Sequence, residues 1–113
     1  MDLKITTKVV EGVTIAEVHG RVVLGDEASH LREFVKDLLT KTDKVILNLR
    51  NVSFIDSGGL GVLVSIHTTA QHKATPVKLS QLTPKVDTLL QVTKLLTVFD
   101  VYTTDEEAIA SFK

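Results

Sequence analysis

The fold depends on residues 53–64, which have the sequence SFIDSGGLGVLV. The segment before them, 45–49, is dense in branched apolar residues, which is typical of a strand covered on both faces. From Leu60 onward, apolar residues recur at helical spacing. The glycines between the strand and the helix let the backbone take positive φ or lie close against another surface. We therefore expect Ser57 at the start of a helix, with little side-chain cover.

The length and composition predict one soluble domain that spans residues 1–113. Hydrophobic residues make up 43% and charged residues 24%, which is ordinary for a globular protein. A net charge of −1 provides no basic field to gather nucleic acid. The chain has no cysteine, which excludes disulfides and thiolate metal sites. No apolar run reaches membrane-spanning length, so we expect a cytoplasmic protein with no metal, no cofactor and no membrane association.

Periodicity along the chain predicts the element order β-β-α-β-α-β-α-β-α. The first two strands are expected on either side of a tight turn at Glu11-Gly12. Strands are expected at 3–9, 13–18, 44–49, 77–79 and 97–102, with loops at 20–25 and 51–55. Helices are expected from Asp26, as N-cap, to 40; from Gly58 or Gly59 to 72; from Thr83-Pro84 to 93; and from the capping box at 104–107 to 112.

A hairpin followed by alternating strands and helices predicts the α/β class. The sheet is expected to be mixed, with four to five strands that run parallel after the first pair, and about four helices packed against it. Functional loops in such sheets gather at the carboxyl ends of the parallel strands. The Asp56-Ser57 turn follows the central strand, so a functional site is expected there.

A hydrolase is the first alternative, because Asp56-Ser57-Gly58-Gly59 resembles the sequence around the nucleophile of trypsin-like proteases. Those proteases are built from β-barrels, whereas this chain alternates helix and strand. A catalytic serine also needs a base aimed at it. His67 lies roughly 15 Å further along the same helix, too far to deprotonate Ser57. We therefore expect no enzymatic activity.

Two other interpretations of the turn stay open. The glycine spacing matches neither the dinucleotide fingerprint nor a P-loop, although free N–H groups at a helix start can hold an anion. Asp56 would repel that anion, yet a nucleotide-binding module remains an alternative. In the structural alternative, Asp56 or Ser57 only caps the helix and the glycines ease the turn.

Val62 and Ile66 also admit two interpretations. At roughly 100° per residue, the helical face from Leu60 to His67 points to the core, and these two residues lie nearly opposite. They either pack under another helix or form an exposed apolar patch one turn from Ser57. An exposed patch there would suit a protein partner.

Residues 54–63, FIDSGGLGVL, resemble the signature of STAS-domain proteins, in particular bacterial anti-sigma-factor antagonists. Weaker similarity extends over nearly the whole chain. The resemblance implies a small cytoplasmic protein that binds an anti-sigma factor of the GHKL serine-kinase type and so frees a sigma factor. It also implies that the kinase phosphorylates the serine after the aspartate, which prevents binding, and that a PP2C-type phosphatase restores it. Many members have a second serine where this chain has Gly58.

From this resemblance we expect Ser57 to be the phosphoacceptor. Phosphate adds about −1.5 to −2 charge at pH 7, and burying it at an interface without counter-ions costs several kcal/mol. A hundredfold loss of affinity then needs no conformational change. A non-phosphorylated STAS scaffold in a signalling or transport complex is the alternative, and we expect a monomer or a weak dimer. The expected partner-binding residues are Asp26, Asp56, Gly58, Gly59, Leu60, Gly61, Val62 and Ile66.

Overall fold

The computed structural model describes residues 3–113, which form one five-stranded sheet in the order β1-β2-β3-β4-β5. β1 and β2 are antiparallel and every later pair is parallel. The α/β class, the element order and the mixed sheet are thereby confirmed. The strands are β1 (Lys4–Val10), β2 (Val13–Val22), β3 (Val45–Ile55), β4 (Val77–Ser80) and β5 (Val101–Tyr102). The helices are α1 (Asp26–Leu39), α2 (Ser57–His72), α3 (Pro84–Val92), the 3-10 turn η1 (Leu95–Thr97) and α4 (Asp105–Ala110).

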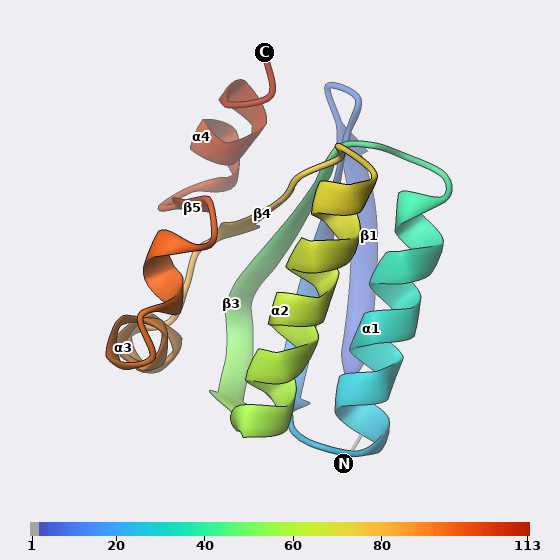
Figure 1. Cartoon of the computed structure of the whole chain (residues 1–113). Coiled ribbons are helices and arrows are strands. Elements are labelled where there is room, and N and C mark those ends of the chain that lie inside the picture. The colour runs from blue at the N-terminus through green and yellow to red at the C-terminus, as the bar shows by residue number, and fades with distance from the viewer. Residues whose placement is uncertain (1–2) are drawn as a thin grey trace.

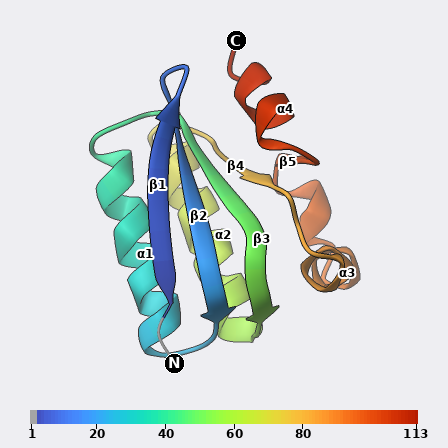
Figure 2. The same ribbon diagram turned by 180° about the vertical axis from the view of Figure 1, so that it is seen from behind.

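The helices cover the two faces of the sheet unequally. α1 and α2 lie side by side over one face of β1–β3 (Figure 1), and the larger core cluster, including Leu47 and Leu63, fills this side. The short helix α4 contributes Ala108 and Ile109 to a second cluster on the opposite face. Seen from that side, β1, β2 and the carboxyl end of β3 carry no helix in front of them (Figure 2).

β3 is longer than the sequence predicted. It continues to Ile55, so the expected loop at 51–55 is strand, with Val52 buried and Phe54 exposed. β2 likewise continues to Val22 through part of the expected loop at 20–25. The β2–β3 register shifts twice, which marks bulges that insert extra residues. Bulges break the two-residue alternation that identifies a strand, and this is why the extension was missed.

The core face of α2 was predicted only in part: Leu63 is buried, and Leu60 and Val64 pack against the core. Its buried residues are Gly59, Val62, Leu63, Ile66 and Ala70. Val62 is 6% exposed and Ile66 only 3%, so the interpretation of these two as an exposed patch is wrong. Apolar residues occur on every side of α2, and spacing alone therefore does not determine which side meets the sheet.

The strand expected at 97–102 is mostly replaced by other structure. η1 occupies Leu95–Thr97, and only Val101 and Tyr102 pair with β4. Phe99 is buried and packs edge-to-face on His67, with ring centroids 5.4 Å apart. Because a 3-10 turn and a buried aromatic ring both use apolar residues, the run resembled a strand.

Two local predictions are confirmed. Glu11 and Gly12 have φ of 52° and 81°, as a two-residue hairpin turn requires. Thr83 caps α3, its side chain accepting a hydrogen bond from the Val86 N–H at 3.2 Å. These signals depend on neighbouring residues only, and they hold in the folded chain.

A buried polar cluster attaches α4 to the sheet. Asp105 is only 7% exposed. It accepts hydrogen bonds from the Asn48 side-chain amide at 3.0 Å and from the Ser80 hydroxyl at 2.6 Å. Thr104 caps α4 as expected, accepting from the Glu107 N–H at 3.1 Å. The first residue of α4 is therefore bonded to both β3 and β4.

Candidate functional site

Asp56 organises the turn between β3 and α2. It is the N-cap of α2, and one carboxylate oxygen accepts from the Gly59 N–H at 2.9 Å. Its two oxygens also accept from the Leu24 N–H, at 3.1 and 3.0 Å. Leu24 belongs to the β2–α1 loop, so this one carboxylate joins two chain segments that are distant in sequence.

The same hydrogen bonds set the charge of Asp56. The backbone N–H groups of Leu24 first, and of Gly59 next, hold the pKa of Asp56 below its ordinary value of 3.8. The carboxylate is therefore ionised at neutral pH. Any further negative charge on the neighbouring Ser57 would stand next to an existing one.

Gly58 and Gly59 permit close packing between α2 and the β2–α1 loop. A Cβ on Gly58 would lie 2.6 Å from the Leu24 Cβ, and one on Gly59 would lie 2.2 Å from the Val22 carbonyl oxygen. Neither position accepts a side chain unless the loop moves. A serine side chain at position 58 would therefore not fit this arrangement without a shift of Leu24.

Ser57 is exposed at the first position of α2. It follows the carboxyl end of β3, next to Asp56, which bonds to the β2–α1 loop. The start of α2 is at the lower end of the molecule in Figure 1. The turn beneath it is held by Asp56 and by the glycine contacts. Ser57 is therefore exposed to solvent on a turn that hydrogen bonds and close packing hold in place.

The expected partner-binding residues divide into two groups. Asp26 is exposed at the start of α1, but the N-cap is Gly25, with φ 111°, so the prediction of Asp26 as N-cap is wrong. Asp56, Gly58 and Leu60 are partly exposed and Gly61 is exposed, whereas Gly59 is buried. Val62 and Ile66 lie in the core and are not available to a partner.

Sequence analysis missed two exposed apolar residues at this end of the molecule. Leu24 is 78% exposed and Phe54 is 38% exposed, and the Arg21 guanidinium lies 5.4 Å from the centre of the Phe54 ring. Leu24 precedes a glycine in a loop, which is a signal that could have identified it. Phe54 was missed because the strand was expected to end at Leu49.

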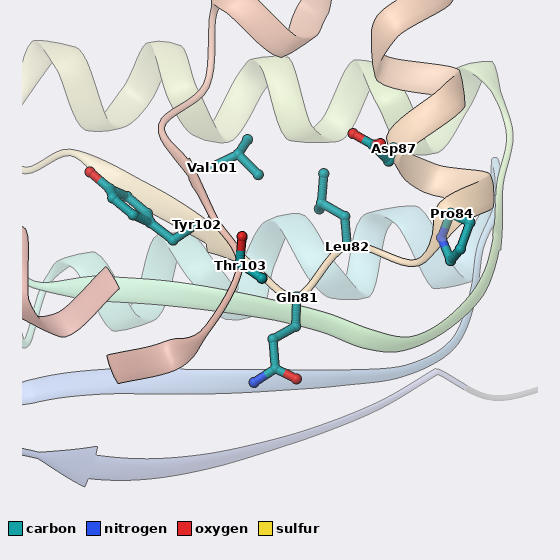
Figure 3. Close-up of a pocket in the computed structure, with 7 residues that line it drawn as sticks. All are labelled: Gln81, Leu82, Pro84, Asp87, Val101, Tyr102 and Thr103. Carbon is teal, nitrogen blue, oxygen red and sulfur yellow. The ribbon is translucent and has the colours of Figure 1, made fainter. Parts of the chain in front are cut away.

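A separate crevice lies at the carboxyl ends of β4 and β5. Figure 3 shows its lining, which includes Gln81, Asp87 and Tyr102, and its volume is about 340 Å³. None of the expected site residues lines it. Within residues 3–113, no three acidic or histidine side chains are grouped to hold a metal ion. No helix in that range has the length and apolarity to cross a membrane.

The family is shown by comparison with known proteins. The model of the STAS domain matches residues 4–108 of this chain. The chain belongs to the STAS-domain family. This confirms the resemblance that was based on residues 54–63.

Two individual proteins are similar to this chain over most of their length. The chain is 26% identical over 115 residues to BtrV of Bordetella bronchiseptica, covering 98% of this chain and 96% of BtrV, whose name assigns it provisionally to the anti-sigma factor antagonists. The crystal structure of tm1081 from Thermotoga maritima, with the same provisional assignment, is 28% identical with a TM-score of 0.86 and covers 95% of this chain and 92% of that one.

A third comparison concerns the fold alone. The Bacillus anti-sigma factor antagonist SpoIIAA is known in an unphosphorylated and a phosphorylated form, each 18% identical to this chain. The TM-scores are 0.70 and 0.73, covering 96% and 97% of this chain and 97% and 100% of those chains.

Proposed function

We propose that this protein is an anti-sigma-factor antagonist whose binding is switched off by phosphorylation of Ser57. The observation that carries the proposal is an exposed serine at the first position of α2, on a turn held by Asp56. Family membership and the names of BtrV and tm1081 support the antagonist role. The protein then acts by binding, without chemistry of its own.

The proposed partner is an anti-sigma factor of the GHKL serine-kinase type, with a PP2C-type phosphatase to reverse the modification. The family resemblance supports both, and we propose that the cycle runs in the cytoplasm. The unphosphorylated protein binds the anti-sigma factor, and the sigma factor is released. The residues proposed to border the contact are Asp26, Asp56, Gly58, Leu60 and Gly61, with Gly59 shaping the turn from beneath.

The electrostatics of the turn favour a block over a refolding event. The N-terminus of α2 stabilises a negative charge beside it by roughly 0.3–1 kcal/mol, so the isolated protein is expected to tolerate the phosphate. A docked partner removes water from the phosphate and from Asp56 together, which costs several kcal/mol.

The test uses the anti-sigma factor captured from the source cell by the wild-type protein and then purified. Unphosphorylated wild type and Ser57→Ala are expected to bind it with equal affinity. Ser57→Asp is expected to bind about a hundredfold more weakly with an unchanged melting temperature. Thr68→Asp, an exposed position further along α2, is the matched control and is expected to bind normally.

Mass spectrometry after incubation with the anti-sigma factor and ATP identifies the modified residue. A single phosphate on Ser57 is expected, and Ser57→Ala should stay unmodified. An unmodified Ser57, or equal affinity for wild type and Ser57→Asp, would contradict the switch. That result would favour a non-phosphorylated STAS scaffold.

A further inference from the structure

An apolar groove lies beside the Ser57 turn, between α3 and the carboxyl end of β3. Both views show α3 next to this part of β3 (Figures 1 and 2). The groove has a volume of about 220 Å³. Its apolar lining consists of Phe54, Ile55, Val86, Leu89 and Val92.

The groove lies close to the turn that carries Ser57. Ile55 lines it two residues before Ser57, and Leu24 lies on the loop that contacts Gly58. Within residues 3–113, five large apolar side chains are exposed. Three of the five, Leu24, Phe54 and Val92, belong to this end of the molecule, with Val92 74% exposed. Exposed apolar side chains gathered in one region mark a contact surface.

The charged side chains that line the groove or stack on its lining are basic. Lys85 lines it, and Arg21 stacks on the Phe54 ring at 5.4 Å. None of the lining residues is acidic, although the whole chain has a net charge of −1. A complementary occupant therefore carries carboxylates next to its apolar side chains.

The size of the groove also limits the occupant. Pockets that enclose small molecules usually measure about 300–1,000 Å³, more than this groove offers. It has room for side chains projecting from a protein surface. The apolar residues act as the buried part of such a contact, and the basic residues form its rim.

We infer that this groove receives an apolar segment flanked by acidic residues on the anti-sigma factor. The inference rests on the proposed function and adds to it a division of roles. The groove supplies affinity in the unphosphorylated state, and Ser57 supplies the control. Basic residues at the rim speed association and make it sensitive to salt.

The test measures binding of the purified anti-sigma factor to groove variants. Val92→Asp is expected to weaken binding at least about tenfold, because it places a charge in the apolar contact and repels carboxylates. Val9→Asp is the matched control: Val9 is 69% exposed on β1, near the opposite end of the molecule. It is expected to bind within about twofold of wild type. Lys85→Glu is expected to weaken binding several-fold and to reduce its dependence on salt.

The outcomes separate this inference from the switch. If Ser57→Asp loses binding while Val92→Asp keeps it, the groove is wrong and the switch stands. If only Val92→Asp loses binding, the groove stands and the switch is wrong. A wild-type protein that binds no anti-sigma factor overturns both. Equal losses for Val9→Asp and Val92→Asp would overturn the groove, as would self-association of the wild type abolished by Val92→Asp. Melting temperatures of all variants exclude unfolding as the cause.

Discussion

Asp56 and Asp105, two of the aspartates at helix starts in this protein, bind their partners in opposite ways. The carboxylate of Asp56, before α2, accepts hydrogen bonds from the backbone N–H groups of Leu24 and Gly59, and Asp56 remains partly exposed. The carboxylate of Asp105, the first residue of α4, accepts hydrogen bonds from the side chains of Asn48 and Ser80, and Asp105 is 7% exposed. One fixes a surface turn, and the other fixes a helix over the sheet.

The difference shows how the molecule separates function from stability. Backbone partners leave the Asp56 turn in contact with water, so charge can be added there without disturbing the core. Side-chain partners enclose Asp105, and removal of its carboxylate leaves buried polar groups without a partner. Under the proposed function, the Ser57 end is the part that is modified, whereas the α4 end serves as support.

The largest expected effect is on stability, from Asp105→Ala. The substitution leaves the Asn48 amide and the Ser80 hydroxyl buried without their acceptor, which costs about 2–4 kcal/mol of unfolding free energy. Urea denaturation followed by circular dichroism measures the loss. Asp105→Asn, which keeps one acceptor oxygen, is expected to lose less. Both folded variants should bind the anti-sigma factor as wild type does, and weakened binding would break the separation between the two ends.

Alanine at the α2 glycines tests how tightly the surface turn is packed. In Gly59→Ala the new Cβ meets the Val22 carbonyl oxygen, and such overpacking costs roughly 1–3 kcal/mol. At Gly61 the space is open, and alanine there is expected to stabilise the helix by up to about 1 kcal/mol. Thermal and urea unfolding of the two variants compare the same substitution two residues apart. If both shift stability in the same direction, close packing does not hold the turn.

These same regions show which structural features can be predicted from the sequence. A cap at Asp56 or Ser57, a helix that starts close to Ser57 and the order of strands followed from local signals and helical spacing. The Leu24–Asp56 bond did not, because it joins segments 32 positions apart. Asn48 offered a signal that was not used. An amide in the buried run 45–49 needs a partner, and Asp105 supplies it.

The groove shows a different limit of sequence analysis. Phe54 belongs to β3, whereas Val92 belongs to α3, and neither residue carries a motif. They meet only because α3 packs beside the end of β3. Bulges concealed the extension of that strand, so the position of Phe54 was beyond what periodicity could predict.

The smallest expected effect is the pH dependence that Asp56 adds to stability. Because its pKa in the folded state lies below the ordinary 3.8, the ionised carboxylate stabilises the fold above that pH. This contribution is lost as the pH falls below about 4 and through the folded-state pKa. Asp56→Asn retains an oxygen that can cap α2 but does not titrate. The unfolding free energy of wild type should therefore fall more steeply than that of Asp56→Asn between pH 5 and about pH 3. Urea unfolding of both proteins across this range gives the difference, in which the other carboxylates cancel. Parallel curves would mean that the Leu24 and Gly59 hydrogen bonds do not favour the charged form, and the contrast with Asp105 would lose its electrostatic part.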